Sequence, residues 1–189
     1  TVVTAQWDAN TALLATLGAR LRAHPPRAVV TLARGSSDHA ATYAKYLVET
    51  RTRVPTASAA PSVSSLYGVD PDLRGCLAIA ISQSGRSPDL LAAVAAARRG
   101  GALVVALCNV ADAPLASLAD CSVPLCAGPE LSVAATKSFI ASLAALAHLV
   151  AAWTADRTLI EQVRALPQAL DEAWRLDWSA ALPVLAPAQ

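Results

Sequence analysis

Short, nearly uninterrupted apolar runs alternate along the chain with longer stretches whose apolar residues recur every three or four positions. Runs of the first kind are typical of strands buried on both faces, and stretches of the second kind are typical of helices on a core. We expect strands at residues 27–33, 54–59, 76–81, 102–108 and 122–125. We expect helices at residues 5–23, 39–50, 88–99, 133–153 and 161–178, with one helical turn at 61–67 and an interruption near Pro167. This alternation predicts an α/β fold: a three-layer, doubly wound, parallel five-stranded sheet flanked by helices.

Composition narrows the class of protein. Of the 189 residues, 54% are hydrophobic and 15% are charged, which predicts a globular chain with one good core. The net charge of +1 gives no sign of a nucleic-acid surface, and the apolar run at 140–153 is too short to span a bilayer and contains His148. The first residues do not resemble a signal peptide. We therefore expect a cytoplasmic protein with no nucleic-acid or membrane partner.

The cysteines and histidines do not form a metal-binding pattern. Cys76, Cys108, Cys121 and Cys126 include no Cys-x-x-Cys pair, and the histidines are scattered. Cys76 and Cys108 fall in predicted buried strands, so we expect reduced thiols, as is usual in the cytoplasm. The glycine motifs that bind nucleotides are also missing from the sequence. The sequence therefore predicts no metal site and no cofactor.

One polar loop joins a predicted buried strand to a predicted helix: Ile81-Ser82-Gln83-Ser84-Gly85-Arg86-Ser87-Pro88-Asp89. Ser87 suits the N-cap of the helix, Pro88 its first position and Asp89 its first turn. The free N–H groups and the dipole of such a helix start favour an anion, and the loop hydroxyls can donate to phosphate oxygens. Gly85 permits close approach of the backbone and a positive φ. The loop predicts a phosphate site, the alternative being an ordinary polar turn.

Two further segments can converge on this loop. They are Arg34-Gly35-Ser36-Ser37, which follows the first strand, and Gly128-Pro129-Glu130-Leu131-Ser132-Val133, which opens the long helix. In parallel sheets the ligand lies at the carboxyl ends of the strands, where the first of these segments also falls. Each segment has an alternative interpretation. Ser36 and Ser37 can serve as N-cap residues, and Glu130 can be a solvated charge or a helix-start charge.

In order and spacing, three stretches of the chain resemble the signature segments of the sugar isomerase (SIS) domain. The stretches are Ala33-Arg34-Gly35-Ser36-Ser37, Ser82-Gln83-Ser84-Gly85-Arg86-Ser87 and Glu130-Leu131-Ser132-Val133-Ala134-Ala135-Thr136-Lys137. The likeness covers residues 26–153. Within the family, the chain is similar to the amino-terminal half of two-SIS-domain enzymes that act on hexosamine phosphates. These include the isomerase part of glutamine–fructose-6-phosphate aminotransferase and the type II glucosamine-6-phosphate deaminases.

The resemblance implies a ligand and the residues that bind it. The ligand would be a hexose or hexosamine 6-phosphate. The implied substrate-binding residues are Gly35, Ser36, Ser37, Ser82, Gln83, Ser84, Ser87 and Val133. The hydroxyl-rich loop would hold the phosphate, Ser36 would touch the phosphate or adjacent sugar oxygens, and the backbone of Val133 would face the sugar. Arg86 and Ala135 depart from the aminotransferase pattern, and the Ser-Pro-Asp ending of the loop is closer to the deaminases.

Catalytic residues are implied to lie mainly outside this chain. In two-SIS-domain enzymes the base glutamate, the ring-opening histidine and a carboxy-terminal lysine belong to the second SIS domain, so the chain resembles a half-enzyme. Glu130 is the only acidic residue in the three segments and is therefore the candidate base. His39 is expected to point along a helix, and Lys137 to lie one turn inside one.

We therefore expect the phosphate-binding half of an amino-sugar-phosphate isomerase or deaminase, with negligible turnover by this chain alone. The alternative is a non-catalytic module that senses sugar phosphates.

The predicted organisation has four parts. They are a helix at residues 1–26 that packs on or swaps between domains, the SIS domain at 27–154, a helical extension at 155–180 and a linker at 181–189. The terminal helices carry Trp7, Trp153, Trp174 and Trp178, which is more tryptophan than one small sheet needs. We expect a homo-oligomer with these helices at the contact.

Overall fold

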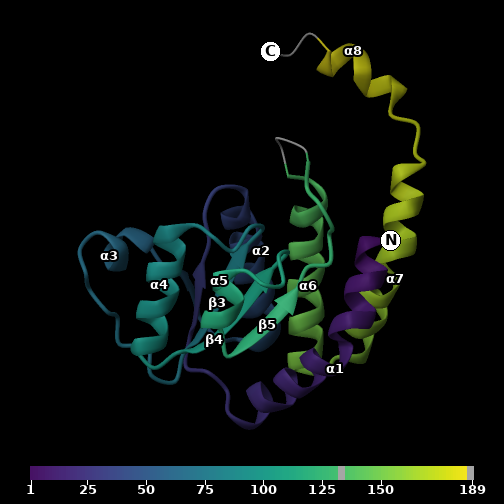
Figure 1. Ribbon diagram of the computed structural model, residues 1–189. Coiled ribbons are helices and arrows are strands. Elements are labelled where there is room, and N and C mark those ends of the chain that lie inside the picture. Colours follow the sequence, from purple (N-terminus) through teal and green to yellow (C-terminus); the bar gives the residue numbers. More distant parts are fainter. Residues whose placement is uncertain (132–134, 187–189) are drawn as a thin grey trace.

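The centre of the fold is a five-stranded sheet with the order β2-β1-β3-β4-β5 (Figure 1). The computed structural model describes residues 1–131 and 135–186. The strands are β1 (Val29–Leu32), β2 (Thr56–Ser58), β3 (Leu77–Ser82), β4 (Leu103–Cys108) and β5 (Cys121–Pro124). All neighbouring strands pair in parallel. The predicted α/β fold with a doubly wound parallel sheet is confirmed.

Helices cover both faces of the sheet (Figure 1). On one side lie α1 (Val2–Ala23), α2 (Ser36–Thr52), α6 (Lys137–Thr154) and α7 (Arg157–Trp174). On the other side lie α3 (Pro61–Ser65), α4 (Pro88–Arg99) and α5 (Pro114–Leu118). After α7 follow a 3₁₀ turn, η1 (Ser179–Ala181), and α8 (Leu182–Leu185). The short α5 is an addition to the expected elements.

The two faces of the sheet are packed by different side chains. Successive residues of a strand point to opposite faces. In β3, Leu77, Ile79 and Ile81 enter the core beneath α2 and α6, whereas Ala78 and Ala80 enter the core beneath α4. Small side chains on the second face allow α4 to lie close to the sheet.

The helix α1 packs on α6 and reaches the edge of the sheet at β5. Two buried amides on α1 bond to the chain at this edge. Gln6 Nε2 donates to the carbonyl oxygens of Leu125 (3.2 Å) and Ala141 (2.8 Å), and Asn10 Nδ2 donates to that of Pro124 (2.9 Å). Polar side chains on the inner face of α1 thus tie it to β5 and α6.

The helices α2 and α6 begin at different residues from those predicted. We expected a turn at 35–38 and a helix from His39, but α2 begins at Ser36. The reason is Gly35, whose φ of 59° turns the chain directly into the helix. The predicted start of the long helix, Val133, lies outside the described residues, and α6 begins at Lys137. Lys137 is therefore the first helical residue rather than one turn inside.

The predicted interruption of the next helix near Pro167 is wrong. α7 begins at Arg157, where Asp156 Oδ1 accepts a hydrogen bond from the Leu159 N–H (3.2 Å), and it continues through Pro167 to Trp174. Proline removes a single N–H donor. The intact hydrogen bonds of the flanking turns explain how the helix continues.

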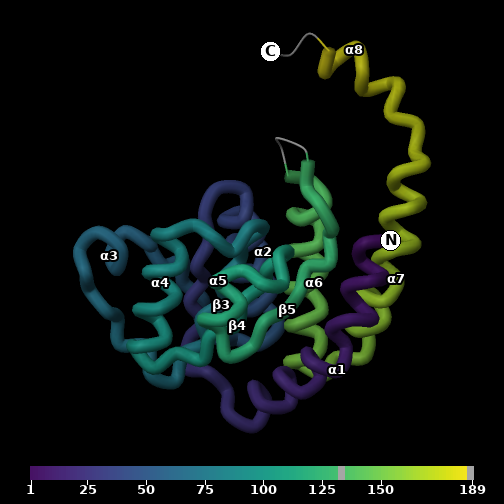
Figure 2. The backbone as a smooth tube through the Cα atoms, in the orientation of Figure 1, coloured from purple at the N-terminus to yellow at the C-terminus, as the bar shows by residue number. Residues whose placement is uncertain are grey.

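The last part of the described chain carries exposed apolar side chains. Figure 2 shows it running away from the sheet towards α8. The side chains are Trp174 (86% exposed), Leu176, Trp178 (63%), Leu182, Val184 and Leu185. By contrast, Trp153 is buried and Trp7 is half-buried. The helical turn of α8 falls within the segment predicted as a linker, whose last residues, 187–189, lie outside the described residues.

Among the described helices, only α6 is long and apolar enough to cross a membrane, with a mean hydropathy of 1.3. However, 67% of it is buried inside the protein. A helix that is apolar all round and covered on most sides fits the interior of a folded domain.

Candidate functional site

The loops that follow β1 and β3 flank the switch point of the sheet. From β1 the chain moves outward to β2, and from β3 it moves the opposite way through β4 to β5. The connections at the carboxyl ends of the adjacent strands β1 and β3 therefore run in opposite directions, and we call the region between these two loops the crevice. Ligands of open α/β sheets lie in such a crevice. The first two sequence segments meet here.

The loop after β3 has a fixed shape that depends on glycine. The buried Ser82 Oγ accepts a hydrogen bond from the Gly85 N–H (2.9 Å), which closes a tight turn. Gly85 has a φ of 63°, and a Cβ added there would lie 2.6 Å from both Cys108 Sγ and Ala113 Cβ. The Leu115 N–H donates to the Gly85 oxygen (3.2 Å). The neighbouring strand and α5 thus hold the loop in place.

This loop leads into α4, as the sequence predicts. Ser87 is the N-cap, Pro88 is the first helical residue and Asp89 lies in the first turn. Within the described residues, the Ser87 side chain makes no capping hydrogen bond. Its hydroxyl is therefore available to a ligand. In the first turn Pro88 has no N–H and the Leu90 N–H donates to Asp89 Oδ1 (2.9 Å), which leaves the Asp89 N–H as the backbone donor towards a ligand. Ser84 Oγ accepts from the Arg86 N–H (3.4 Å), which leaves its own proton free to point outward.

The loop after β1 also ends at a helix start. Gly35 is the N-cap of α2, and Ser36 and Ser37 are its first two residues. The Asp38 N–H donates to the Gly35 oxygen (3.0 Å). Ser36 is exposed and Ser37 is half-buried, so the crevice is bordered by the starts of two helices, α2 and α4.

An ion pair links the two loops across the crevice. The guanidinium of Arg34, two residues after the end of β1, pairs with the Asp89 carboxylate in the first turn of α4. The side chains are 60% and 30% exposed, respectively. Sequence analysis assigned Arg34 no role; its only signal was an arginine directly after one strand and an aspartate at the helix start after another.

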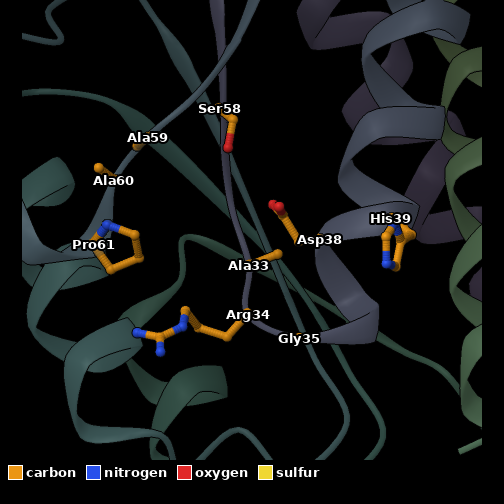
Figure 3. Close-up of a pocket in the computed structure, with 9 residues that line it drawn as sticks. All are labelled: Ala33, Arg34, Gly35, Asp38, His39, Ser58, Ala59, Ala60 and Pro61. Atoms are coloured by element: carbon orange, nitrogen blue, oxygen red, sulfur yellow. The ribbon is translucent and has the colours of Figure 1, made fainter.

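A cavity of about 400 Å³ adjoins the first loop on the β2 side (Figure 3). It is lined by Ala33, Arg34, Gly35, Asp38, His39, Ser58, Ala59, Ala60 and Pro61. Its size is in the usual range for small-molecule sites. In Figure 3 the side-chain oxygens of Asp38 and Ser58 face each other, while the ring of His39 points away from Asp38. Asp38 and Ser58 are polar groups that sequence analysis did not select, because their proximity depends on the pairing of β1 with β2.

The third segment is tied into the start of α6. Glu130 Oε2 accepts hydrogen bonds from the Ser138 N–H (2.9 Å) and Ser138 Oγ (3.0 Å). These bonds, led by the one from the backbone, hold the pKa of Glu130 below its ordinary value. Lys137 Nζ donates to the Pro129 oxygen (2.7 Å). Glu130 therefore acts as a helix-start charge here. Val133, the predicted binding residue in this third segment, lies outside the described residues.

The titratable groups outside these segments form no metal site in the part of the chain that the structure describes. Within residues 1–131 and 135–186, no group of three or more histidine, cysteine or acidic side chains is arranged to hold a metal ion. All four cysteines are free; Cys76 and Cys108 are buried, as expected. His148 is buried and stacks on Trp7, with ring centroids 4.0 Å apart.

Comparison with protein families identifies one match. The model of the SIS domain family matches residues 24–152, which include both loops of the crevice and the start of α6. The chain is 35% identical over 154 residues to a glutamine–fructose-6-phosphate aminotransferase of Corynebacterium glutamicum. That alignment covers 76% of this chain and 24% of the relative. The chain thus spans about a quarter of the length of the curated relatives that it resembles.

Solved structures share the fold over different lengths. A structure from Silicibacter pomeroyi, assigned as a candidate phosphosugar isomerase, is 42% identical with a TM-score of 0.95, over 99% of this chain and 57% of that one. The C-terminal domain of glucosamine-fructose-6-phosphate aminotransferase from Francisella tularensis is 26% identical, with a TM-score of 0.68. It matches over 76% of this chain and 42% of that one. The first match includes the exposed carboxyl-terminal part.

Proposed function

Because the chain belongs to the SIS domain family, we propose that it binds the phosphate group of a hexose or hexosamine 6-phosphate between the loops that follow β1 and β3. The observation that carries the proposal is the start of α4, where the hydroxyl-rich loop of residues 82–87 ends in an N-cap serine that makes no capping hydrogen bond in the described part of the chain. Gly85 and Ser82 fix the loop before the ligand arrives, so little order has to be created on binding.

The proposed contacts follow the geometry of the two helix starts. Ser84, Ser87 and the Gln83 amide hold the phosphate. Ser82 shapes the loop and directs its hydroxyl proton towards the phosphate. Ser36 and Ser37, with Gly35 before them, contact the phosphate or the adjacent sugar oxygens from the start of α2. Val133 retains its proposed position facing the sugar.

We propose further that the chain is the phosphate-binding half of an amino-sugar-phosphate isomerase or deaminase, of the class that interconverts glucosamine 6-phosphate and fructose 6-phosphate. Its sequence identity to isomerising aminotransferases supports this class of enzyme. Glu130 is the candidate base in this chain, but its carboxylate already bonds to the start of α6. That observation favours negligible turnover by the chain alone, and it equally supports the second candidate, a non-catalytic sensor of sugar phosphates.

The exposed carboxyl-terminal helices support a homo-oligomer. Trp174 and Trp178 are too exposed for side chains of their size unless another surface covers them. We expect light scattering at micromolar concentration to give a dimer or larger species, and Trp174→Ser with Trp178→Ser to shift it towards the monomer. A monomeric wild-type chain would contradict this proposal.

The ligand proposal is tested by the thermal shift of the chain with glucosamine 6-phosphate and with unphosphorylated glucosamine. A ligand at a hundred times its Kd adds about 2.7 kcal/mol to the free energy of unfolding. Only the phosphorylated sugar should raise the melting temperature, and equal shifts would refute phosphate recognition. A coupled assay for fructose 6-phosphate and ammonia then separates the candidates. Turnover that appears when a second SIS domain is added supports the half-enzyme, and binding without turnover in both cases supports the sensor.

A further inference from the structure

We propose that Arg34 is an additional ligand of the phosphate, held beside the crevice by Asp89 and transferred from the carboxylate to the phosphate when the sugar binds. This inference rests on the proposed function and adds a selectivity device to the same site. In the structure the Arg34–Asp89 pair spans the two loops between which the phosphate is proposed to lie.

The position of Arg34 places its guanidinium within the crevice region. The residue lies two positions after β1, lines the cavity beside the first loop and reaches the first turn of α4. It thus approaches the helix start from the opposite loop. An arginine that can touch this helix start can also touch an anion bound there.

The ion pair between Arg34 and Asp89 is weak enough for Arg34 to leave the carboxylate for another anion. Both side chains are partly exposed, so water and salt screen their attraction. A phosphate group carries more charge than a carboxylate and matches the two-pronged guanidinium with paired hydrogen bonds. Competition between the two acceptors therefore favours the phosphate.

Asp89 keeps partners after the exchange. Its Oδ1 accepts a hydrogen bond from the Leu90 N–H (2.9 Å), and its place in the first turn of α4 is favoured by the helix dipole. The carboxylate is therefore not left unpaired when Arg34 moves. With an uncharged sugar there is no competing acceptor, and Arg34 stays on Asp89. Arg34 thereby increases the preference for phosphorylated sugars, and Asp89 holds it beside the crevice at a cost in affinity.

A double-mutant cycle tests the exchange by calorimetric titration with glucosamine 6-phosphate. We expect Arg34→Gln to weaken binding by about ten-fold or more, since a charge-assisted contact is lost. Asp89→Asn should tighten binding by about two- to five-fold, because Arg34 no longer has to leave a charged partner. In the Arg34→Gln background the same Asp89→Asn change should give no gain. Circular dichroism and thermal unfolding confirm that each variant is folded.

Asp70→Asn is the matched control. Asp70 pairs with Arg99 at the opposite end of α4, so this variant removes the same charge from a similar exposed Arg–Asp pair. It should leave affinity unchanged. An equal gain from Asp89→Asn in both backgrounds would overturn the exchange and attribute the effect to charge at the helix start. Unaltered affinity in Arg34→Gln would also overturn it. If wild-type protein does not bind glucosamine 6-phosphate at all, the proposed function fails together with this inference.

Discussion

The helices α4 and α6 lie on opposite faces of one sheet, and their starts are satisfied in opposite ways. At α4, the N-cap Ser87 makes no capping hydrogen bond among the described residues, and the Asp89 carboxylate accepts from the Leu90 N–H and pairs with Arg34 of the other loop. At α6, Glu130 already occupies the start through its two bonds to Ser138. Both segments contain serines before an apolar helix. The comparison teaches that the two helix starts differ in how their own carboxylate is held. Glu130 accepts two bonds from Ser138, whereas Asp89 is shared with Arg34 and leaves the N-cap hydroxyl of α4 without a capping bond among the described residues.

The two helices also differ in how much of their length is buried. Every residue of α6 from Ala144 to Ala151 is buried, including His148. The buried face of α4 consists of alanine, valine and leucine, and its opposite face is accessible. α6 therefore contributes mainly to the stability of the fold, whereas α4 contributes mainly to the proposed site.

The largest effect is expected from Gly85→Ala, which should disrupt the loop that leads into α4. The new Cβ would collide with Cys108 and Ala113, and the positive φ would strain any residue other than glycine. We expect a loss of about 4 kcal/mol in the free energy of unfolding. Urea unfolding measures this loss, and titration with glucosamine 6-phosphate should show no binding by the remaining folded protein.

Gly128→Ala is the control for this substitution. Gly128 also has a positive φ, of 66°, but its added Cβ meets no atom within 4 Å. It should cost only the backbone strain, about 1 kcal/mol. Equal losses at the two glycines would show that packing against Cys108 does not determine the loop.

The next effect concerns the interior of α6 and depends on pH. Burial lowers the pKa of His148 to about 4, below its ordinary value of 6.5. The unfolded chain therefore takes up a proton that the native chain excludes, and stability falls as the pH is lowered from 6.5 towards 4. The loss should reach roughly 3 kcal/mol.

His148→Phe keeps the stacking on Trp7 without the titration. The variant should show a smaller loss than wild type over the same pH range, measured by urea midpoints. Identical pH profiles for the two proteins would refute a neutral, buried His148.

Ser84→Ala should weaken the binding of glucosamine 6-phosphate by roughly 2 kcal/mol, the order of one charge-assisted hydrogen bond. Stability should change little, because the Ser84 hydroxyl makes only a long bond within its own loop. Isothermal titration measures the first effect and thermal unfolding the second. A loss of stability with unchanged affinity would show that Ser84 supports the loop and does not contact the ligand.

Ser138→Ala is the same substitution at the other helix start and should have the opposite outcome. It removes one of the two hydrogen bonds to Glu130 and should cost about 1 kcal/mol of stability. The affinity for the phosphosugar should be unchanged. If affinity falls as well, the start of α6 belongs to the ligand site and the contrast between the two helices is lost.

Sequence could predict the strands and the start of α4 because local patterns determine them. Each buried strand is an apolar run, and Ser87 with Pro88 marks a helix start within two residues. The pairing of Arg34 with Asp89 could not be predicted, because it joins residues 55 positions apart and depends on β1 lying beside β3. The bond from Ser138 to Glu130 likewise joins residues eight positions apart, one before the start of α6 and one within it. The start of α2 was missed since three polar residues after Gly35 suggested a turn rather than a helix.

The amides of α1 have a consequence for folding during synthesis. Gln6 is synthesised before its acceptors, which lie 119 and 135 positions later in the chain, and the acceptor of Asn10 lies 114 positions later. At translation rates of 5–20 residues per second, α1 must wait on the order of ten seconds for β5 to be made. Its apolar face remains available to chaperones during that interval. The helix α1 is thus made well before the segments on which it docks.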